Sequence, residues 1–302
     1  MPNRLLLALA GSRAVRRFVT YSRVARPVVE RFVAGESLDQ AMAAARRLEE
    51  SGIRVVLDHL GEHATQELQA DVAAGAYLDL LDRIAAEHLD AHISVKLTQL
   101  GLDLSFEGCL ARLERICRSA GKVGTPVAID MESHAYTDRT IEIYGRMRPR
   151  HDRLVLCLQA YLKRTGADLE ALLPSRPSLR LCKGAYNEPK EIRLTRFQTR
   201  DAFRRLLGAS LRACPYTAVA THDELLIKEA LRLARRYRIA SERFEVQMLY
   251  GVRRELQARL AAEGLTVRVY VPFGTRWFGY LMRRLAERPA NLRLLVEALI
   301  RG

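Results

Sequence analysis

Two adjacent arginines near the end of the chain have the residue types and the spacing to bind an anion. Tyr280, Arg283, Arg284 and Glu287 stand at positions i, i+3, i+4 and i+7, which places them on one face of a helix. Paired guanidinium groups present planar hydrogen-bond donors that match a carboxylate or a phosphate. Alone, an arginine pair in so arginine-rich a chain predicts only a solvated charged surface, so its role depends on the elements around it.

Polar residues also recur where short apolar segments end. Lys96 and Lys183 are flanked by apolar residues, and such a lysine can form a Schiff base, bind an anion or pair with a carboxylate such as Asp130. Arg180 lies three residues before Lys183, so strand alternation does not place both on one face, and Arg180 must reach a shared site by its length or serve elsewhere. The full series is Asp58, Lys96, Asp130, Gln159, Lys183, Thr221, His222, Gln247 and Tyr270.

The apolar segments that carry these residues alternate with amphipathic stretches of helical period. This alternation predicts βαβ units and a parallel sheet, and eight units of roughly 30 residues predict a (βα)8 barrel of the TIM type. A doubly wound open sheet is the alternative, weakened because no G-x-G-x-x-G motif follows the first segment. In a barrel, the polar strand ends would face one active site. The predicted strands are 53–58, 92–97, 126–131, 153–159, 178–183, 216–221, 244–249 and 266–271.

The segments between the strands predict the helices. One long helical stretch ends near residue 88, and another begins near residue 138. The others are 106–120, 167–173, 195–211, 223–237, 252–263 and 280–287.

Composition predicts a globular protein with a large core. The chain has 302 residues, 49% of them hydrophobic and 28% charged. Residues 1–33 predict one or two helices, and a capping box at Ser37-Leu-Asp-Gln40 opens a further helix that ends at Gly52. We therefore expect N-terminal helices in 1–52 and the barrel in 53–302. No apolar run reaches the roughly 18 residues that would span a bilayer, and we expect a cytoplasmic protein.

The net charge of +14 favours polyanionic partners such as nucleic acid or an anionic membrane surface. The basic residues are spread along the helices without a basic tail or an aromatic-basic motif, which argues against nucleic-acid binding and leaves a peripheral membrane contact open. The five cysteines are scattered and form no CxxC pair, so neither a disulfide framework nor a metal site is expected.

Eight short segments occur in order along the predicted strands and the last helix: Ser94-Val-Lys-Leu97, Ile129-Asp-Met-Glu132, Gln159-Ala-Tyr161, Arg180-Leu-Cys-Lys-Gly-Ala-Tyr186, Ala220-Thr-His222, Phe244-Glu-Val-Gln-Met-Leu249, Tyr270-Val-Pro-Phe-Gly-Thr275 and Tyr280-Leu-Met-Arg-Arg-Leu285. Taken together, these segments resemble the proline dehydrogenase family, in its stand-alone bacterial form. The resemblance covers about residue 35 to the C-terminus, runs in order from the second strand to the eighth, and implies a distorted (βα)8 barrel that binds FAD at the strand C-termini. Asn187 stands where the family often has an aromatic residue.

The resemblance implies a role for individual residues in the substrate pocket. Arg283 and Arg284, helped by Lys96, would hold the proline carboxylate, and Glu287 would orient the two guanidinium groups. Tyr270 and Leu249 would pack on the pyrrolidine ring, Asp130 would lie beside Lys96, and Arg180 would lie against the flavin near N5. The residues implied to line the FAD are Met131, Gln159, Arg180, Leu181, Cys182, Lys183, Ala185, Tyr186, Thr221 and His222.

The implied reaction is the FAD-dependent oxidation of L-proline to 1-pyrroline-5-carboxylate, the first step of proline catabolism to glutamate. A hydride would pass from proline C5 to flavin N5, and the electrons would continue to a membrane quinone. The implied partners are the quinone, an anionic membrane surface on the inner face of the cell membrane, and 1-pyrroline-5-carboxylate dehydrogenase as the downstream enzyme. The alternative is a lysine-dependent aldolase or lyase barrel, because such enzymes also place lysines at strand ends.

Overall fold

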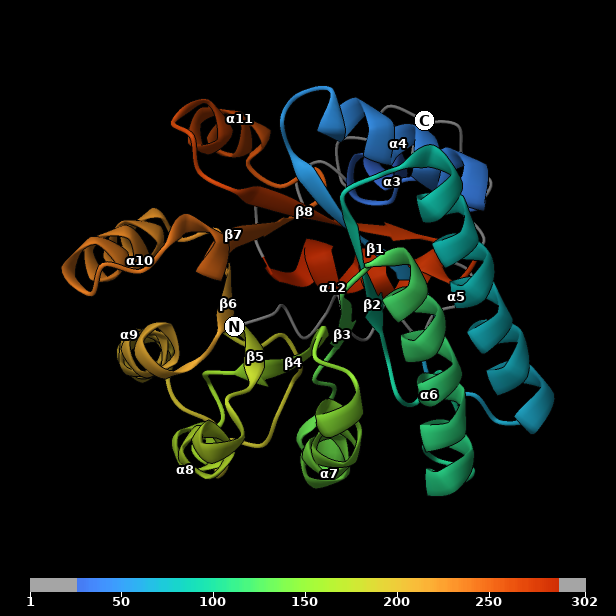
Figure 1. The fold of residues 1–302 in the computed structure, drawn as a ribbon, viewed down its shortest axis with the longest axis horizontal. Coiled ribbons are helices and arrows are strands. Elements are labelled where there is room, and N and C mark those ends of the chain that lie inside the picture. Colours follow the sequence, from blue (N-terminus) through green and yellow to red (C-terminus); the bar gives the residue numbers. More distant parts are fainter. Residues whose placement is uncertain (1–25, 288–302) are drawn as a thin grey trace.

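The protein is a closed barrel of eight parallel strands, in the order β1-β2-β3-β4-β5-β6-β7-β8 (Figure 1). The structure, a computed structural model, describes residues 26–287. It confirms the (βα)8 barrel, because an open doubly wound sheet would leave β1 and β8 unpaired, whereas Asp58 of β1 pairs with Pro272 of β8. The strands are β1 (Arg54–His59), β2 (Ala91–Val95), β3 (Val127–Ile129), β4 (Leu154–Gln159), β5 (Ser178–Cys182), β6 (Tyr216–Ala220), β7 (Phe244–Leu249) and β8 (Val267–Phe273).

A helix follows each strand, and two further helices precede β1 in the described part of the chain. The first two are α3 (Arg26–Phe32) and α4 (Leu38–Glu49). After the strands come α5 (Glu67–Glu87), α6 (Phe106–Val123), α7 (Thr137–Met147), α8 (Thr165–Leu172), α9 (Arg196–Ala213), α10 (Glu224–Arg236), α11 (Arg254–Ala262) and α12 (Trp277–Glu287). Short 3₁₀ helices lie at His134–Tyr136, Arg148–Arg150, Leu173–Ser175 and Ser241–Arg243.

Local sequence signals explain where these helices begin. The predicted capping box at the start of α4 is present, because the Ser37 side chain accepts from the backbone N–H of Gln40 and the Gln40 side chain returns to the backbone of Ser37. Thr195 and Gln198 form a second capping box at the start of α9. β2 and β3 end two residues earlier than predicted, so Lys96 and Asp130 stand just beyond their strands.

Strand alternation divides the barrel residues into an apolar outer set and an unusually polar inner set. The hydrophobic core lies between strands and helices and includes Leu57, Ile93, Leu156, Val219 and Val269. The neighbours of these core residues along each strand point to the opposite face, into the barrel. Several inward residues are both polar and buried, namely Asp58, Ser94, Arg180, Glu245, Gln247 and Arg268.

The last helix departs from the expected barrel pattern. Its apolar residues Phe278 and Leu281 pack with Phe32 of α3 in a second hydrophobic cluster, separate from the barrel core. α4 instead packs against β1 and β8, and its Met42 belongs to the barrel core. α4 therefore covers the flank where an eighth barrel helix would pack, and α12 is free to bring its arginines to the strand ends.

The division into N-terminal helices and a barrel at residue 52 stays a prediction. Within residues 26–287, none of the helices combines the length and the apolar character that a membrane span requires.

Candidate active site

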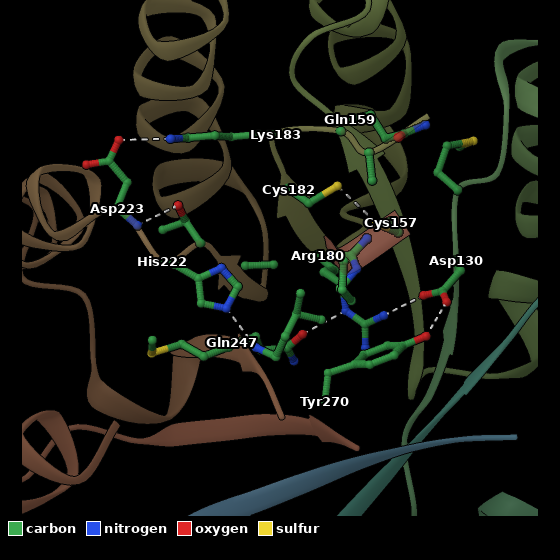
Figure 2. A pocket seen from close by; sticks show the side chains of 18 of the residues that line it. Asp130, Cys157, Gln159, Arg180, Cys182, Lys183, His222, Asp223, Gln247 and Tyr270 are labelled. Atoms are coloured by element: carbon green, nitrogen blue, oxygen red, sulfur yellow. Dashed lines mark hydrogen bonds and ion pairs between the residues drawn. The ribbon is translucent and has the colours of Figure 1, made fainter. Parts of the chain in front are cut away.

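A cavity of about 720 Å³ lies at the C-terminal ends of the strands, where the polar series was predicted to converge (Figure 2). Its size is typical of a small-molecule or cofactor site, roughly 300–1,000 Å³. The predicted residues among its lining are Lys96, Asp130, Met131, Gln159, Arg180, Cys182, Lys183, Ala185, Tyr186, Thr221, His222, Leu249, Tyr270, Arg283 and Arg284.

Lys96 joins two carboxylates at the floor of the cavity, the buried Asp58 and the half-buried Asp130. Its Nζ donates to Asp58 Oδ1 at 2.9 Å and lies 3.3 Å from Asp130 Oδ2. The phenol of Tyr270 donates to Asp130 Oδ2 at 2.6 Å and lies 3.4 Å from Lys96 Nζ. Four side chains from β1, β8 and the ends of β2 and β3 thus meet at one point. Asp58 belongs to the predicted polar series but had been given no role.

Arg180 enters this cluster from β5. Its Nη1 donates to Asp130 Oδ1 at 2.6 Å, and its Nε donates to Gln247 Oε1 at 2.7 Å (Figure 2). Nη1 also donates to Ser94 Oγ at 2.8 Å. Its Nη2 is buried without a hydrogen-bond partner among the described residues. Arg180 therefore reaches the site directly from the barrel interior, and one of its nitrogens keeps its donor capacity for a ligand.

Charge balance fixes the protonation states at the cavity floor. Burial would raise the pKa of Asp130, but Lys96 and Arg180 lower it below its ordinary value, so Asp130 is a carboxylate. Burial likewise lowers the pKa of Lys96, but the carboxylates, Asp58 first, hold it well above its ordinary value. Burial raises the pKa of Tyr270 well above 10, so the phenol stays protonated. A Schiff-base lysine must be a free amine, so this environment disfavours that role for Lys96.

Arg283 has a carboxylate partner that was not predicted. Its Nη2 lies 2.5 Å from Oε1 of Glu62, in the loop between β1 and α5, and its guanidinium lies over the Tyr186 ring with 5.9 Å to the centroid. Arg284 is buried and stacks on the Tyr280 ring at 5.2 Å. The predicted role of Glu287 in orienting the guanidiniums stays a prediction.

The other half of the cavity is lined by backbone-held polar groups and by cations. Lys183 donates to Asp223 at 2.8 Å, and the backbone N–H of Leu249 donates to Nε2 of His222 at 2.9 Å (Figure 2). Gln159 donates to the carbonyl of Glu132 at 2.8 Å. Lining cations that the prediction missed are Arg196, Arg200 and Arg253, which carry no local sequence signal in a chain so rich in arginine.

Leu181 does not line this cavity, in contrast to its neighbours Arg180 and Cys182. It is 2% exposed and belongs to the hydrophobic core outside the barrel. The expectation that it lines the cofactor treated a strand segment as if both of its faces were available, whereas alternation turns every second side chain away.

Gly184, which lines the cavity, lets the loop after β5 pack closely against the Tyr161 ring. Its φ is +112°, and a Cβ at this position would lie 2.2 Å from the Tyr161 ring. Together with the free Nη2 of Arg180 and the cationic rim, this surface suits a large, flat ligand that carries negative charge. Within residues 26–287, no cluster of three or more His, Cys, Asp or Glu residues could hold a metal ion.

Comparison with known proteins gives consistent results. A family model described as Proline dehydrogenase matches residues 41–295. Proline dehydrogenase 1 of Bacillus subtilis subsp. natto is 40% identical over 272 residues, 90% of each chain. Proline dehydrogenase of Deinococcus radiodurans is 38% identical over 283 residues, 91% of each chain.

Longer proteins match through one part of their length. Bifunctional protein PutA of Escherichia coli is 26% identical over 331 residues, 95% of this chain and 25% of PutA. The crystal structure of proline utilization A from Bdellovibrio bacteriovorus, inactivated by N-propargylglycine, superposes with a TM-score of 0.81. At 22% identity it covers 87% of this chain and 33% of its own, and it shows that the fold is shared.

Proposed function

The chain belongs to the proline dehydrogenase family, whose members oxidise proline in proline catabolism, and from this premise we propose that it is an FAD-dependent L-proline dehydrogenase. The product would be 1-pyrroline-5-carboxylate, and the electrons would pass on to a quinone. The observation that carries this proposal is the meeting of Lys96, Asp130, Arg180 and Tyr270 in a cavity that an arginine pair also lines.

The cavity has the features that a flavin nucleotide needs. Arg180 Nη2 has spare donor capacity at the cavity floor, and Gly184, which lines the cavity, allows the loop after β5 to pack directly against the Tyr161 ring. Lys183 and the three cations Arg196, Arg200 and Arg253 suit the phosphates of a dinucleotide. When bound, the flavin would accept a hydride from C5 of proline at its N5 atom. The residues proposed to hold it are Met131, Gln159, Arg180, Cys182, Lys183, Ala185, Tyr186, Thr221 and His222.

The substrate carboxylate would bind between Arg283, Arg284 and Lys96. Three cations can hold one small anion in a fixed orientation, which directs the opposite edge of the ring toward the reacting atom of the cofactor. Tyr270 and Leu249 would pack on the ring and exclude water. Glu62, which accepts from both terminal nitrogens of Arg283, would orient this guanidinium, the role predicted for Glu287.

Asp130 and Arg180 would act on the charge that develops in the reaction. Asp130 is held as a carboxylate and accepts hydrogen bonds from Tyr270 and Arg180, which fixes both of these groups at the cavity floor. Arg180 keeps its positive charge and would stabilise the negative charge that gathers on a reduced flavin.

The decisive assay is product formation with a soluble electron acceptor. Purified protein should convert L-proline to 1-pyrroline-5-carboxylate, detected by mass spectrometry, while a redox dye is reduced in equal amount. Loss of proline with neither 1-pyrroline-5-carboxylate nor reduced dye formed, or trapping of an adduct on Lys96 by borohydride, would favour the lysine-dependent lyase instead.

The physiological acceptor and location belong to the same proposal. A net charge of +14 suits contact with an anionic membrane surface, where a quinone could collect the electrons. We expect a cytoplasmic protein that binds vesicles containing anionic lipid and reduces a short-chain quinone in their presence. 1-pyrroline-5-carboxylate dehydrogenase would act next, and nucleic acid would not bind. Vesicle co-sedimentation at two salt concentrations tests the membrane contact.

A further inference from the structure

A chain of hydrogen bonds runs through the interior of the barrel from its far end to the cavity. Asp90, between α5 and β2, accepts from Arg268 Nη2 at 3.2 Å, and Arg268 Nε donates to Glu245 at 2.8 Å. Gln247 Nε2 donates to Glu245 Oε1 at 2.7 Å, and Gln247 Oε1 accepts from Arg180 Nε at 2.7 Å. The four inner members are each less than 5% exposed. Arg180 is thus bound from the barrel interior, through Gln247, as well as from the cavity side, through Asp130.

The direction of the Gln247 amide is set by its two neighbours. Arg180 Nε can only donate, so it requires the amide oxygen. Glu245 pairs with Arg268, and its carboxylate can only accept, so it requires the amide nitrogen. A flipped amide would place its NH₂ group against a guanidinium and its oxygen against a carboxylate. Glu245 therefore locks Gln247 in the one orientation that presents an acceptor to Arg180.

The bond to Gln247 also decides how the Arg180 guanidinium is turned. Nη1 is bound to Asp130 and Ser94, while Nη2 lies without a partner among the described residues. A planar group held at Nη1 alone could swing about that contact. The second bond, at Nε, fixes the plane and with it the direction of the free Nη2.

We propose that Gln247, oriented by Glu245, is the positioning residue that aims Arg180 at the bound flavin. This inference rests on the proposed function, because it assigns Arg180 to the flavin. Gln247 acts through Arg180, so its removal changes the influence of the cation on the flavin while Arg180 itself remains. Without its acceptor, the buried Nε would turn toward Asp130, the carboxylate that Nη1 already contacts, and Nη2 would turn away from the cofactor.

The test is the midpoint potential of the bound flavin, measured under anaerobic conditions in Gln247→Met, Arg180→Ala and the double variant. Methionine keeps the length of the side chain and removes the acceptor. Arg180→Ala should give a more negative potential, and Gln247→Met should shift it in the same direction by a smaller amount. In the double variant, Gln247→Met should add nothing to the effect of Arg180→Ala, because it acts through that residue.

Gln257→Met is the matched control. Gln257 is also buried and donates to the carbonyls of Leu249 and Val252, at 3.0 and 2.9 Å, but it makes no contact with Arg180. This variant should lower the thermal unfolding temperature and leave the potential unchanged, which separates positioning from general loss of structure.

Two failures are distinguishable. If the unaltered protein binds no flavin, or proline does not reduce the flavin, the proposed function itself is wrong. If proline reduces the flavin and Arg180→Ala shifts the potential, but Gln247→Met leaves it unchanged, raises it, or still shifts it in the Arg180→Ala background, the role of Gln247 is overturned.

Discussion

The guanidinium of Arg283 lies against the carboxylate of Glu62, with 2.5 Å between Nη2 and Oε1 and 3.2 Å between Nη1 and Oε2. The ion pair joins α12 to the loop after β1, and its two side chains are 27% and 22% exposed. An arginine that already binds a carboxylate of the protein at the edge of the cavity is well placed to bind the carboxylate of a substrate. The substrate would share the guanidinium with Glu62.

Replacing Arg283 or Arg284 with Met should raise the KM for proline at least about tenfold, since a hydrogen bond to a charged group is worth roughly 1.5–3 kcal/mol. Glu62→Gln should raise it less, because the amide oxygen can still accept one bond from Arg283. Steady-state kinetics with a fixed dye concentration measure the effect, and flavin absorbance controls for cofactor loss. An unaltered KM in both arginine variants would remove the pair from the substrate site.

Tyr270 should set the preference for an unsubstituted ring. Its hydroxyl donates to Asp130 and lies near Lys96, so the phenol fills a defined place beside the proposed substrate. A 4-hydroxyl on proline would lie against the phenol without a good partner, and burying an unpaired hydroxyl costs about 1–3 kcal/mol. The protein should therefore prefer L-proline to trans-4-hydroxy-L-proline strongly. Tyr270→Ser should narrow the ratio of the two kcat/KM values, chiefly by impairing proline oxidation. A ratio that stays constant would place Tyr270 outside the substrate pocket.

Gly184→Ala should abolish flavin retention. The added Cβ would lie 2.2 Å from the Tyr161 ring at a φ of +112°, so the loop after β5 must move. Gly121→Ala is the control, because Gly121 is exposed within α6 and nothing lies within 4 Å of the added atom. It should be neutral or stabilise the fold by about 0.5–1 kcal/mol. The flavin-to-protein absorbance ratio after gel filtration reports the result. Full flavin retention in Gly184→Ala would contradict the proposed role of the loop after β5 in flavin binding.

His92 should make the protein sensitive to acid. Burial, followed by the charge of Arg268, holds its pKa well below 6.5 in the folded state. As the pH falls below about 6.5, His92 binds a proton in the unfolded chain but not in the folded protein. The free energy of unfolding therefore decreases by up to about 1.4 kcal/mol per pH unit. His92→Gln should flatten this dependence. Urea unfolding at pH 5 and pH 7.5 measures it, and an equal loss in both proteins would assign the effect to other groups.

Much of the site could be predicted because a parallel barrel brings all strand C-termini to one end. Knowing only that Lys96, Asp130 and Tyr270 each stand one residue before the end of a predicted strand, one can place them near one another. Individual contacts between side chains far apart in the sequence could not be predicted from the positions of the strands. Glu62 lies in a loop with no distinguishing pattern, and the spacing around it says nothing of Arg283, more than 200 residues away.

The barrel was also predicted correctly from the sequence, but the prediction missed the packing between segments far apart in the chain. Period and composition located the eight strands, but they could not show that α4 packs against β1 and β8 while α12 packs with α3. Both helices are amphipathic, and only the shape of the completed barrel decides which of them covers which surface. Leu181 shows the same limit for a single residue. Its strand was located correctly, but its side chain points to the hydrophobic core and not to the cavity.

The central claim is best tested by an anaerobic titration of the purified protein with L-proline, followed by absorbance. The account predicts a yellow protein with the spectrum of an oxidised flavin, extracted by acid as FAD. That absorbance should bleach stepwise with added L-proline, and L-alanine at the same concentration should have no effect. A colourless protein that FAD cannot reconstitute, or a flavin spectrum that proline leaves unchanged, would contradict the account.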